Sequence, residues 1–294
     1  MIKQTLTFQS PLSLSLRNKQ LIIHLKDVDQ EISRPIEDIG VVIIENQMVK
    51  MTVPLLNEFA DKNVVVIFCD GHAMPKSMLM PLDANTTLQE TYRFQLDASQ
   101  PMKKQAWKQI VESKIRNQSR LLDKLSIEAS ALKPFYMNVK SGDSDNREGA
   151  AARIYWNLLL GKDFSRSREG APPNNLLNYG YAILRAATAR ALLGSGLYPA
   201  FGIYHRNRYN AFPLADDLME PYRPFVDEIV YHLYHDGCHE KLEKDAKVTL
   251  QRLLFCDVTL GKVTRPLEVA LSITTASLAK VFRKEEAELV LPVL

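Results

Sequence analysis

The pattern of apolar residues changes near residue 85, and this change limits the possible folds more than any other feature. Before that point the apolar runs are short. Two of them, residues 39–45 and 64–68, are rich in valine and isoleucine, which is typical of buried strands. Between them Thr52 can cap a helix that runs to about Asp61. The first part of the chain is therefore expected to form a small β domain of sandwich type with one helix.

After a polar break at residues 82–87, the apolar residues recur at helical spacing almost to the end of the chain. Pro172 and Pro173 open one predicted helix, and Gly194 closes it. This order, strands first and helices later, predicts the α+β class with segregated domains. We expect a small N-terminal β-sandwich-like domain over residues 1–84, a linker over 85–92 and a larger all-helical domain over 93–294.

The composition excludes several classes of protein. With 46% hydrophobic and 24% charged residues the chain is ordinary for a globular protein, and its 294 residues suffice for two domains. The first ten residues lack the apolar core of a signal peptide, and no run approaches the roughly 18 apolar residues of a membrane helix. The scattered cysteines, Cys69, Cys238 and Cys256, are typical of reduced thiols. We therefore predict a cytoplasmic protein with no membrane segment.

The net charge of +3 is unevenly distributed. Residues 91–210 carry 19 basic and 9 acidic side chains, whereas the parts on either side are slightly acidic. Some of the arginines stand close to aromatic residues, as in Arg153-Ile-Tyr-Trp156, and this mixture suits phosphate contact and base stacking. The pattern favours a nucleic acid partner. A solvated surface with scattered basic residues is the alternative.

A glutamate, Glu148, stands between an arginine and a glycine at the start of an alanine-rich helix, in SDNREGAAARIYW. One interpretation is local: Asp145 caps the helix and Glu148 completes a capping box. The other interpretation rests on the neighbours. Gly149 weakens the helix, which suggests that something approaches its backbone, and Ala151 and Ala152 leave space beside the carboxylate. Glu148 would then face a cavity.

A second stretch, YHRNRYNAFPLADDLMEPYRPFVDE, combines one histidine with several carboxylates. Asp217 and Glu220 are three residues apart, so a helix places both on one face. His205 precedes them across a loop that contains two arginines. One imidazole with two or three carboxylates can bind Mg²⁺ or Mn²⁺, and such a cation can polarise a phosphoryl oxygen. Alternatively, the acidic residues are dipole partners at a helix start and the histidine is structural.

A third group, His232, His235, Cys238 and His239, has a spacing that resembles a zinc site. However, Gly237 is expected to end the helix at this point, and no second Cys/His pair follows at zinc-finger distance. Histidines near a helix C-terminus are favoured by the helix dipole in any case. A zinc enzyme built on these residues is therefore the less favoured alternative.

Taken together, these stretches resemble a known family, the CRISPR-associated integrase that is numbered first among the Cas proteins, and within it the integrases of type II systems. The resemblance covers nearly the whole chain. It is specific in REGAAARIYWNLLLGKDFSRSREGAPPNNLLNYGYAILRA, in GLYPAFGIYHRNRYNAFPLADDLMEP and in the β-then-α order. It implies that Glu148, His205 and Glu220 are catalytic and bind Mg²⁺ or Mn²⁺, with Asp217 behind them or linked through water.

The resemblance also implies phosphoryl transfer, in which the 3′-hydroxyl of a spacer strand attacks a phosphodiester at the boundary of a CRISPR repeat. The same site acting with water, or in reverse on branched DNA, gives nuclease or disintegrase activity. Five residues are expected to contact double-stranded or branched DNA: Arg147, Arg206 and Arg208 at phosphates, and Tyr155 and Trp156 by stacking. A DNA-binding scaffold with an inert acidic cluster is the alternative function.

The partners follow from the same resemblance. The β domain is expected to form a homodimer, and two dimers are expected to flank a dimer of the small second-numbered Cas protein in a heterohexamer. The C-terminal segment LVLPVL would then either dock on that partner or pack on the core of its own domain.

Overall fold

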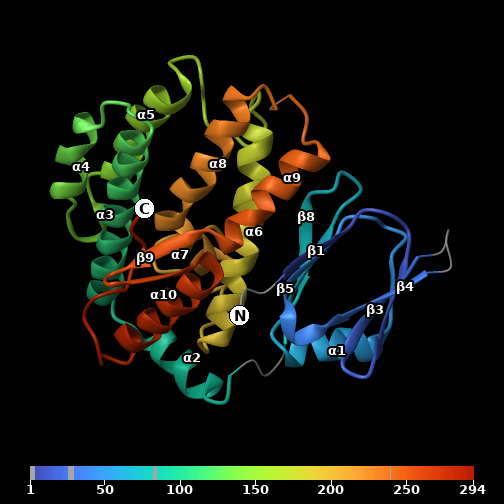
Figure 1. Ribbon diagram of the computed structural model, residues 1–294. Helices are drawn as coiled ribbons and strands as arrows, with labels where there is room; N and C mark the ends of the chain where they lie inside the picture. Colours follow the sequence, from blue (N-terminus) through green and yellow to red (C-terminus); the bar gives the residue numbers. More distant parts are fainter. Residues whose placement is uncertain (1–3, 26–29, 82–84, 239) are drawn as a thin grey trace. The chain divides into compact units, whose positions relative to one another are not determined.

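The structure is a computed structural model that describes residues 4–25, 30–81, 85–238 and 240–294 (Figure 1). The chain divides into two compact units, residues 1–86 and 87–294. The first unit contains most of the strands and the second contains most of the helices, so the predicted α+β class is confirmed. Within the described ranges, no helix combines the length and the apolar character that crossing a membrane requires.

The first unit contains two four-stranded sheets. In order across the first sheet, the strands are β1 (Gln4–Phe8), β5 (Ile39–Ile44), β7 (Val65–Cys69) and β8 (Pro75–Leu79). In order across the second sheet, they are β4 (Gln30–Pro35), β3 (Gln20–Leu25), β2 (Ser13–Arg17) and β6 (Lys50–Met51). Strands β1, β5 and β7 are parallel, and β8 returns antiparallel.

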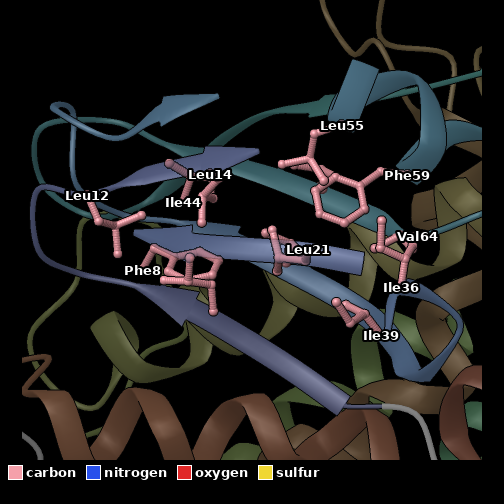
Figure 2. Close-up of a cluster of buried hydrophobic side chains, with 13 residues drawn as sticks. Phe8, Leu12, Leu14, Leu21, Ile36, Ile39, Ile44, Leu55, Phe59 and Val64 are labelled. Atoms are coloured by element: carbon pink, nitrogen blue, oxygen red, sulfur yellow. The ribbon is translucent and has the colours of Figure 1, made fainter. Parts of the chain in front are cut away.

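The core of this unit lies between the sheets and helix α1 (Val53–Asp61), as Figure 2 shows. Leu21 comes from the second sheet and Ile39 from the first, and both are fully buried. Leu55 and Phe59, one helical turn apart on α1, are fully buried in the same cluster. All six residues of β5 are buried, as expected for a strand in the middle of a parallel array.

The second unit is built mainly from helices. They are α2 (Leu88–Asp97), α3 (Gln100–Lys124), α4 (Lys133–Met137), α5 (Arg147–Leu160), α6 (Asn174–Gly194), α7 (Pro213–Met219), α8 (Arg223–His235), α9 (Lys244–Gln251) and α10 (Leu267–Phe282). Helix α3 packs against α4, α5 and α8, and α6 packs against α7, α8, α9 and α10. A short 3₁₀ turn, η4 (Glu220–Tyr222), joins α7 to α8 and also lies on α3.

Two predictions about this part of the chain need correction. Helix α2 begins at Leu88, so much of the segment predicted as a linker, 85–92, is helical. The second unit is also not entirely helical, because β9 (Asp257–Leu260) and β10 (Val263–Pro266) form an antiparallel hairpin. Its strands are rich in β-branched residues, and Gly261 at φ +59° provides the left-handed backbone that the tight turn requires.

The last residues pack along α3, where Figure 1 also places the C-terminus. The backbone N–H of Leu289 donates to Gln109 at 2.8 Å, and Val293 pairs with Thr259 of β9. The side-chain amide of Asn117 donates to the carbonyl of Pro292 at 3.0 Å. Of the two alternatives for the segment LVLPVL, this protein therefore shows packing on its own unit.

Candidate active site

The first backbone N–H groups of helix α5 are bonded to side chains other than the ones predicted. Asp143 accepts the backbone N–H of Arg147 at 2.8 Å and that of Glu148 at 3.1 Å. The N-cap is Asn146, and Asp145 instead forms an ion pair with Arg147 at 2.9 Å. The predicted capping box is therefore wrong, and the Glu148 carboxylate has another role.

The glycine after Glu148 is explained by this cap. The side chain of Asn146 accepts the N–H of Gly149 at 3.2 Å, and a Cβ at position 149 would come within 2.7 Å of the same side chain. The group that approaches the backbone at Gly149 is therefore the Asn146 side chain of the protein itself. Ala151 is fully buried, whereas Ala152 lines a cavity beside α5.

The carboxylate of Glu148 points to a lysine on α3. The Nζ of Lys114 lies 2.6 Å from Oε1 of Glu148 and 2.5 Å from Oε2 of Glu220. These oxygens are therefore at most about 5 Å apart, close to the separation that two oxygens can have when each lies about 2.0–2.6 Å from one divalent cation. The structure brings the two predicted carboxylates together around a positive charge.

Glu220 has a second cationic partner. Arg223 begins α8 three residues later, and its Nε lies 2.9 Å from Oε1 of Glu220. Burial raises the pKa of Glu220, but the charges of Arg223 and Lys114 outweigh this effect and hold the pKa at about 2. Glu220 is therefore an anion at neutral pH, although its side chain is only 5% exposed.

His205 is held by Asp217, which is completely buried. One oxygen of Asp217 accepts the backbone N–H groups of Ile203 at 2.6 Å and Tyr204 at 3.0 Å. The other oxygen lies 3.2 Å from the backbone nitrogen of His205 and 2.6 Å from its Nδ1. With Nδ1 engaged, Nε2 is the ring nitrogen that can bind a cation.

The charges of the two glutamates also affect the pKa of the His205 imidazole. The hydrogen bond that Nδ1 of His205 donates to Asp217 raises the pKa of His205 above its usual value, and although burial acts in the opposite direction, the charges of Asp217, Glu220 and Glu148 add to the increase. Trp107 packs edge to face against the imidazole and is stacked on Tyr204, with centroids 4.3 Å apart. These contacts fix the orientation of the ring.

In the part of the chain that the structure describes, no three His, Cys, Asp or Glu side chains are already grouped as a metal site. The donor types nevertheless suit Mg²⁺ or Mn²⁺, because two carboxylates already share one positive charge and their charges also act on the imidazole of His205. The shared positive charge is that of Lys114, so the lysine must move before a cation can bind both glutamates.

The arginines predicted to contact DNA differ in their surroundings. Arg147 is paired with Asp145 and lies over the ring of Phe135. Arg206 and Arg208 are exposed, and neither forms an ion pair with an acidic residue of the described chain. Arg206 donates to the Gln100 amide at 2.8 Å, and the guanidinium of Arg208 lies over the ring of Tyr209.

The adjacent aromatic residues of α5 point in different directions. Tyr155 is fully buried and donates its hydroxyl to Asp227 at 2.7 Å, so the prediction that it stacks on DNA is wrong. Trp156 is half-buried, and its ring lies 5.4 Å from that of Phe164. Because successive side chains on a helix are about 100° apart, only one of the two can face the core.

A cavity of about 420 Å³ adjoins Glu220. Its wall includes Lys114 and Glu220, together with Arg153 and Trp156 of α5. Asp227 of α8 lines the same cavity, and burial raises its pKa to about 6 even though two tyrosine hydroxyls are bonded to it. Three arginines, Arg153, Arg166 and Arg223, give the wall a positive charge.

The structure does not support the alternative zinc site. His232 and His235 make ring contacts with Tyr231, and the described residues around them form no metal-ligating group. Cys238 is exposed, and its Sγ lies 3.8 Å from the carbonyl oxygen of Asp236. The fourth residue of the predicted cluster, His239, lies outside the described residues.

Sequence reasoning missed three residues that hold the site together, namely Lys114, Asp143 and Arg223. Lys114 lies on a helix where lysines and arginines recur every few residues, so nothing in the local sequence distinguishes it. Asp143 and Arg223 carry a weak signal, because each stands within five residues of a predicted catalytic glutamate.

Comparison with known proteins gives consistent matches. The family described as CRISPR associated protein Cas1 matches residues 6–258. The chain is 39% identical to the CRISPR-associated endonuclease Cas1 of Neisseria meningitidis serogroup C over 236 residues, which are 80% of this chain and 77% of that protein.

Two solved structures share the fold. A casposase bound to an integration product matches with a TM-score of 0.80 at 21% identity, over 98% of this chain and 92% of that one. A chain of a Cas6–RT–Cas1–Cas2 complex matches with a TM-score of 0.73 at 21% identity, over 99% of this chain and 36% of that longer one.

Proposed function

This chain belongs to the Cas1 family, as its sequence motifs predicted, and on that premise we propose that it is a metal-dependent DNA integrase and endonuclease that inserts spacer DNA into a CRISPR array. One observation carries the proposal: Glu148 and Glu220 both contact the ammonium of Lys114, and the buried Asp217 fixes Nδ1 of His205. This is a donor arrangement for phosphoryl transfer.

In the proposed reaction, the 3′-hydroxyl oxygen of a spacer strand forms a bond to a phosphorus atom of the repeat boundary. The bond from that phosphorus to the 3′-oxygen of the repeat strand breaks, and the departing oxygen takes up a proton. One phosphodiester replaces another, so no external energy source is required. With water as the nucleophile, the same exchange is hydrolysis. The protein therefore contributes mainly positioning and electrostatics.

The residues that would hold Mg²⁺ or Mn²⁺ are Glu148, Glu220 and His205 through Nε2. A bound divalent cation would stabilise negative charge on the phosphate and activate the attacking oxygen. Asp217 is proposed to act behind His205, because its two oxygens are already occupied by backbone N–H groups and by Nδ1. It orients the imidazole and keeps the proton on Nδ1.

The DNA is proposed to lie across the exposed part of the site. Arg206 and Arg208 flank His205 and have no carboxylate partner in the described chain, so their guanidinium groups are available for phosphates. Trp156 presents a half-buried ring next to the cavity and suits stacking on a base. Arg147 would have to leave Asp145 before it could contact a phosphate.

We also infer the partners. The β unit is proposed to form a homodimer, and two such dimers to flank a dimer of Cas2, because a fold match lies within a chain of a complex that contains Cas2. The cytoplasm is the proposed location, since the CRISPR array is there. The substrates are double-stranded spacer DNA and the CRISPR repeat, with branched DNA as the product-like form.

The test is strand transfer on DNA with Mn²⁺ or Mg²⁺, resolved on a denaturing gel. Glu148→Gln removes a charge with little change in volume and should reduce joining by about 100-fold or more, comparable to the loss of one key electrostatic group. Glu112→Gln is the matched control, because Glu112 lies on the outer part of α3 with Lys108. Circular dichroism should show that both variants are folded.

The alternative of a DNA-binding scaffold predicts a different result. Wild-type protein would bind branched DNA tightly and join none of it with either cation, and Glu148→Gln would bind equally well. That outcome would remove the enzymatic proposal while leaving the family assignment in place.

A further inference from the structure

Lys114 is the residue of the site for which the proposed reaction gives no role. It projects from the middle of α3, and its ammonium touches both catalytic glutamates, at 2.6 and 2.5 Å. The side chains of Lys114, Glu148 and Glu220 are 12%, 19% and 5% exposed, so this is a largely buried ion triad. Two carboxylates this close would repel each other in a medium of low dielectric constant if the lysine were absent.

The ammonium is charged at neutral pH. Burial alone would lower the pKa of Lys114, but the charges of Glu148 and Glu220 raise it by more, and the net shift is upward. Lys114 is therefore a resident counter-ion rather than a neutral amine. It keeps the carboxylates close together and ionised in the absence of any other cation.

The position of Arg223 decides which oxygen a metal ion can use. Arg223 is bonded to Oε1 of Glu220, so Oε2 is the oxygen left for a cation. That oxygen is the one that the ammonium of Lys114 contacts at 2.5 Å. A divalent cation at Glu148 and Glu220 would thus lie within a few ångströms of the ammonium, where like charges repel.

There is space for the lysine to move. Lys114 lines the cavity of about 420 Å³ beside Glu220, and its flexible four-carbon side chain can place the ammonium at several points of the wall. Arg153 and Trp156 of α5 line the same cavity. Trp156 is one of the residues proposed to contact DNA, so an ammonium that moves into the cavity can reach a DNA phosphate.

We propose that Lys114 is exchanged for the metal ion: its ammonium holds Glu148 and Glu220 in the metal-free protein, and on metal binding it moves into the adjoining cavity and contacts a DNA phosphate. The inference rests on the proposed function. In this proposal Lys114 is a positioning residue that couples binding of the metal ion to binding of DNA. Metal binding frees the lysine for DNA, and DNA that binds the lysine frees the carboxylates for metal.

The first test is Mn²⁺ binding without DNA, measured by titration calorimetry on wild type, Lys114→Met and Lys108→Met. Removing the competing ammonium should tighten Mn²⁺ binding by about tenfold, within the 5–150-fold range of typical coupling between two ligands. The Lys114 variant should also melt at a lower temperature without Mn²⁺ and recover part of the loss with it. Lys108, which pairs with Glu112 on the same helix, should behave like wild type.

The second test is the affinity for branched DNA with dideoxy 3′ ends, which bind but cannot react. Mn²⁺ should strengthen binding by wild type several-fold, and Lys114→Met should lose most of this gain. If Lys114→Met does not fold, Lys114→Gln, which keeps a hydrogen-bond donor without the charge, takes its place in both tests.

The inference is overturned if the neutral variant binds Mn²⁺ no more tightly than wild type, or if its DNA affinity responds to Mn²⁺ as wild type does. Failure of the proposed function has another signature: wild type would bind no Mn²⁺ and join no DNA. A wild type that joins DNA, together with a variant whose Mn²⁺ affinity is unchanged, rejects only the role of Lys114.

Discussion

Asp217→Asn is the change that should separate a residue that orients a ligand from a ligand itself. Asp217 is 0% exposed. Its two oxygens accept three backbone N–H groups, and one of them lies 2.6 Å from Nδ1 of His205. Asparagine keeps the shape but has only one acceptor oxygen. If that oxygen serves Ile203 and Tyr204, its NH₂ group must face His205.

The expected loss of stability follows from those contacts. Two bonds to His205 lose their acceptor, and hydrogen bonds to charged groups contribute about 1.5–3 kcal/mol each, so the variant should lose about 3–6 kcal/mol. In a unit the size of residues 87–294, each kcal/mol corresponds to about 2–4 °C, so the melting temperature should fall by about 6–24 °C.

The effect on metal binding has a separate cause. An NH₂ group at Nδ1 favours the tautomer that carries its proton on Nε2, and a protonated Nε2 cannot bind a cation. Loss of such a supporting carboxylate typically costs 10–100-fold in metal affinity or activity, and that range is expected for Mn²⁺ here. Calorimetry with Mn²⁺ and a strand-transfer assay measure the two effects.

The control is Asp216→Asn, one residue away. Asp216 pairs with Arg185 at 2.8 Å and does not contact His205, so Mn²⁺ affinity should be unchanged. The reasoning fails if Asp217→Asn binds Mn²⁺ within twofold of wild type. It also fails if Asp216→Asn weakens Mn²⁺ binding as much, since the effect would then be one of local charge and not of tautomer.

Three further changes test other parts of the site. Replacing Arg206 and Arg208 together with alanine should weaken DNA binding, and the slope of log affinity against log salt concentration should become less steep by about 2, at about 0.9 per phosphate contact. Stability should change little, because surface substitutions usually alter it by no more than about 0.5 kcal/mol. A large drop in melting temperature with unchanged DNA affinity would make these arginines structural. Trp156→Ala should weaken binding of single-stranded DNA by about 1–3 kcal/mol in an anisotropy assay, and Trp156→Phe should retain most of the wild-type affinity. Equal affinities for the wild type and both variants would exclude stacking. Asp227 has a folded pKa of about 6, above its ordinary 3.8, so the folded state holds the proton between about pH 4 and 6 and loses this advantage as pH rises. Stability should therefore fall by up to about 3 kcal/mol across that window in the wild type, and the fall should be absent in Asp227→Asn; identical pH curves in thermal melts would contradict the assignment.

The fold could be predicted where the spacing of apolar residues along the sequence matches the period of a strand or a helix. The valine- and isoleucine-rich runs and the helical spacing gave the right order of elements because burial imposes those periods. The hairpin at residues 257–266 was missed because it is short and stands between two helices, where only Gly261 and its β-branched neighbours indicate it. The start of α2 at Leu88 was missed because a polar sequence concealed it.

The site could be predicted only where spacing or family motifs mark it. Glu148, His205 and Glu220 carry that signal, and the structure brings the two glutamates to one point. Lys114 has none, because its partners come from segments far along the chain, the nearer of them 34 residues away. Tyr155 was misassigned since an aromatic pair does not reveal which ring faces the core.

The contact between Asn117 and the last residues has a consequence for how the protein is made. The side-chain amide of Asn117 donates to Pro221, in the turn that carries Glu220, and also to Pro292. Its oxygen accepts the N–H of Leu294 at 3.3 Å. A ribosome releases Glu148 and Glu220 before residues 289–294, so a nascent chain carries both glutamates while this link is still missing. The neighbourhood of Glu220 takes its final form only after these last residues have left the ribosome, so chains interrupted during translation should lack a fully assembled site.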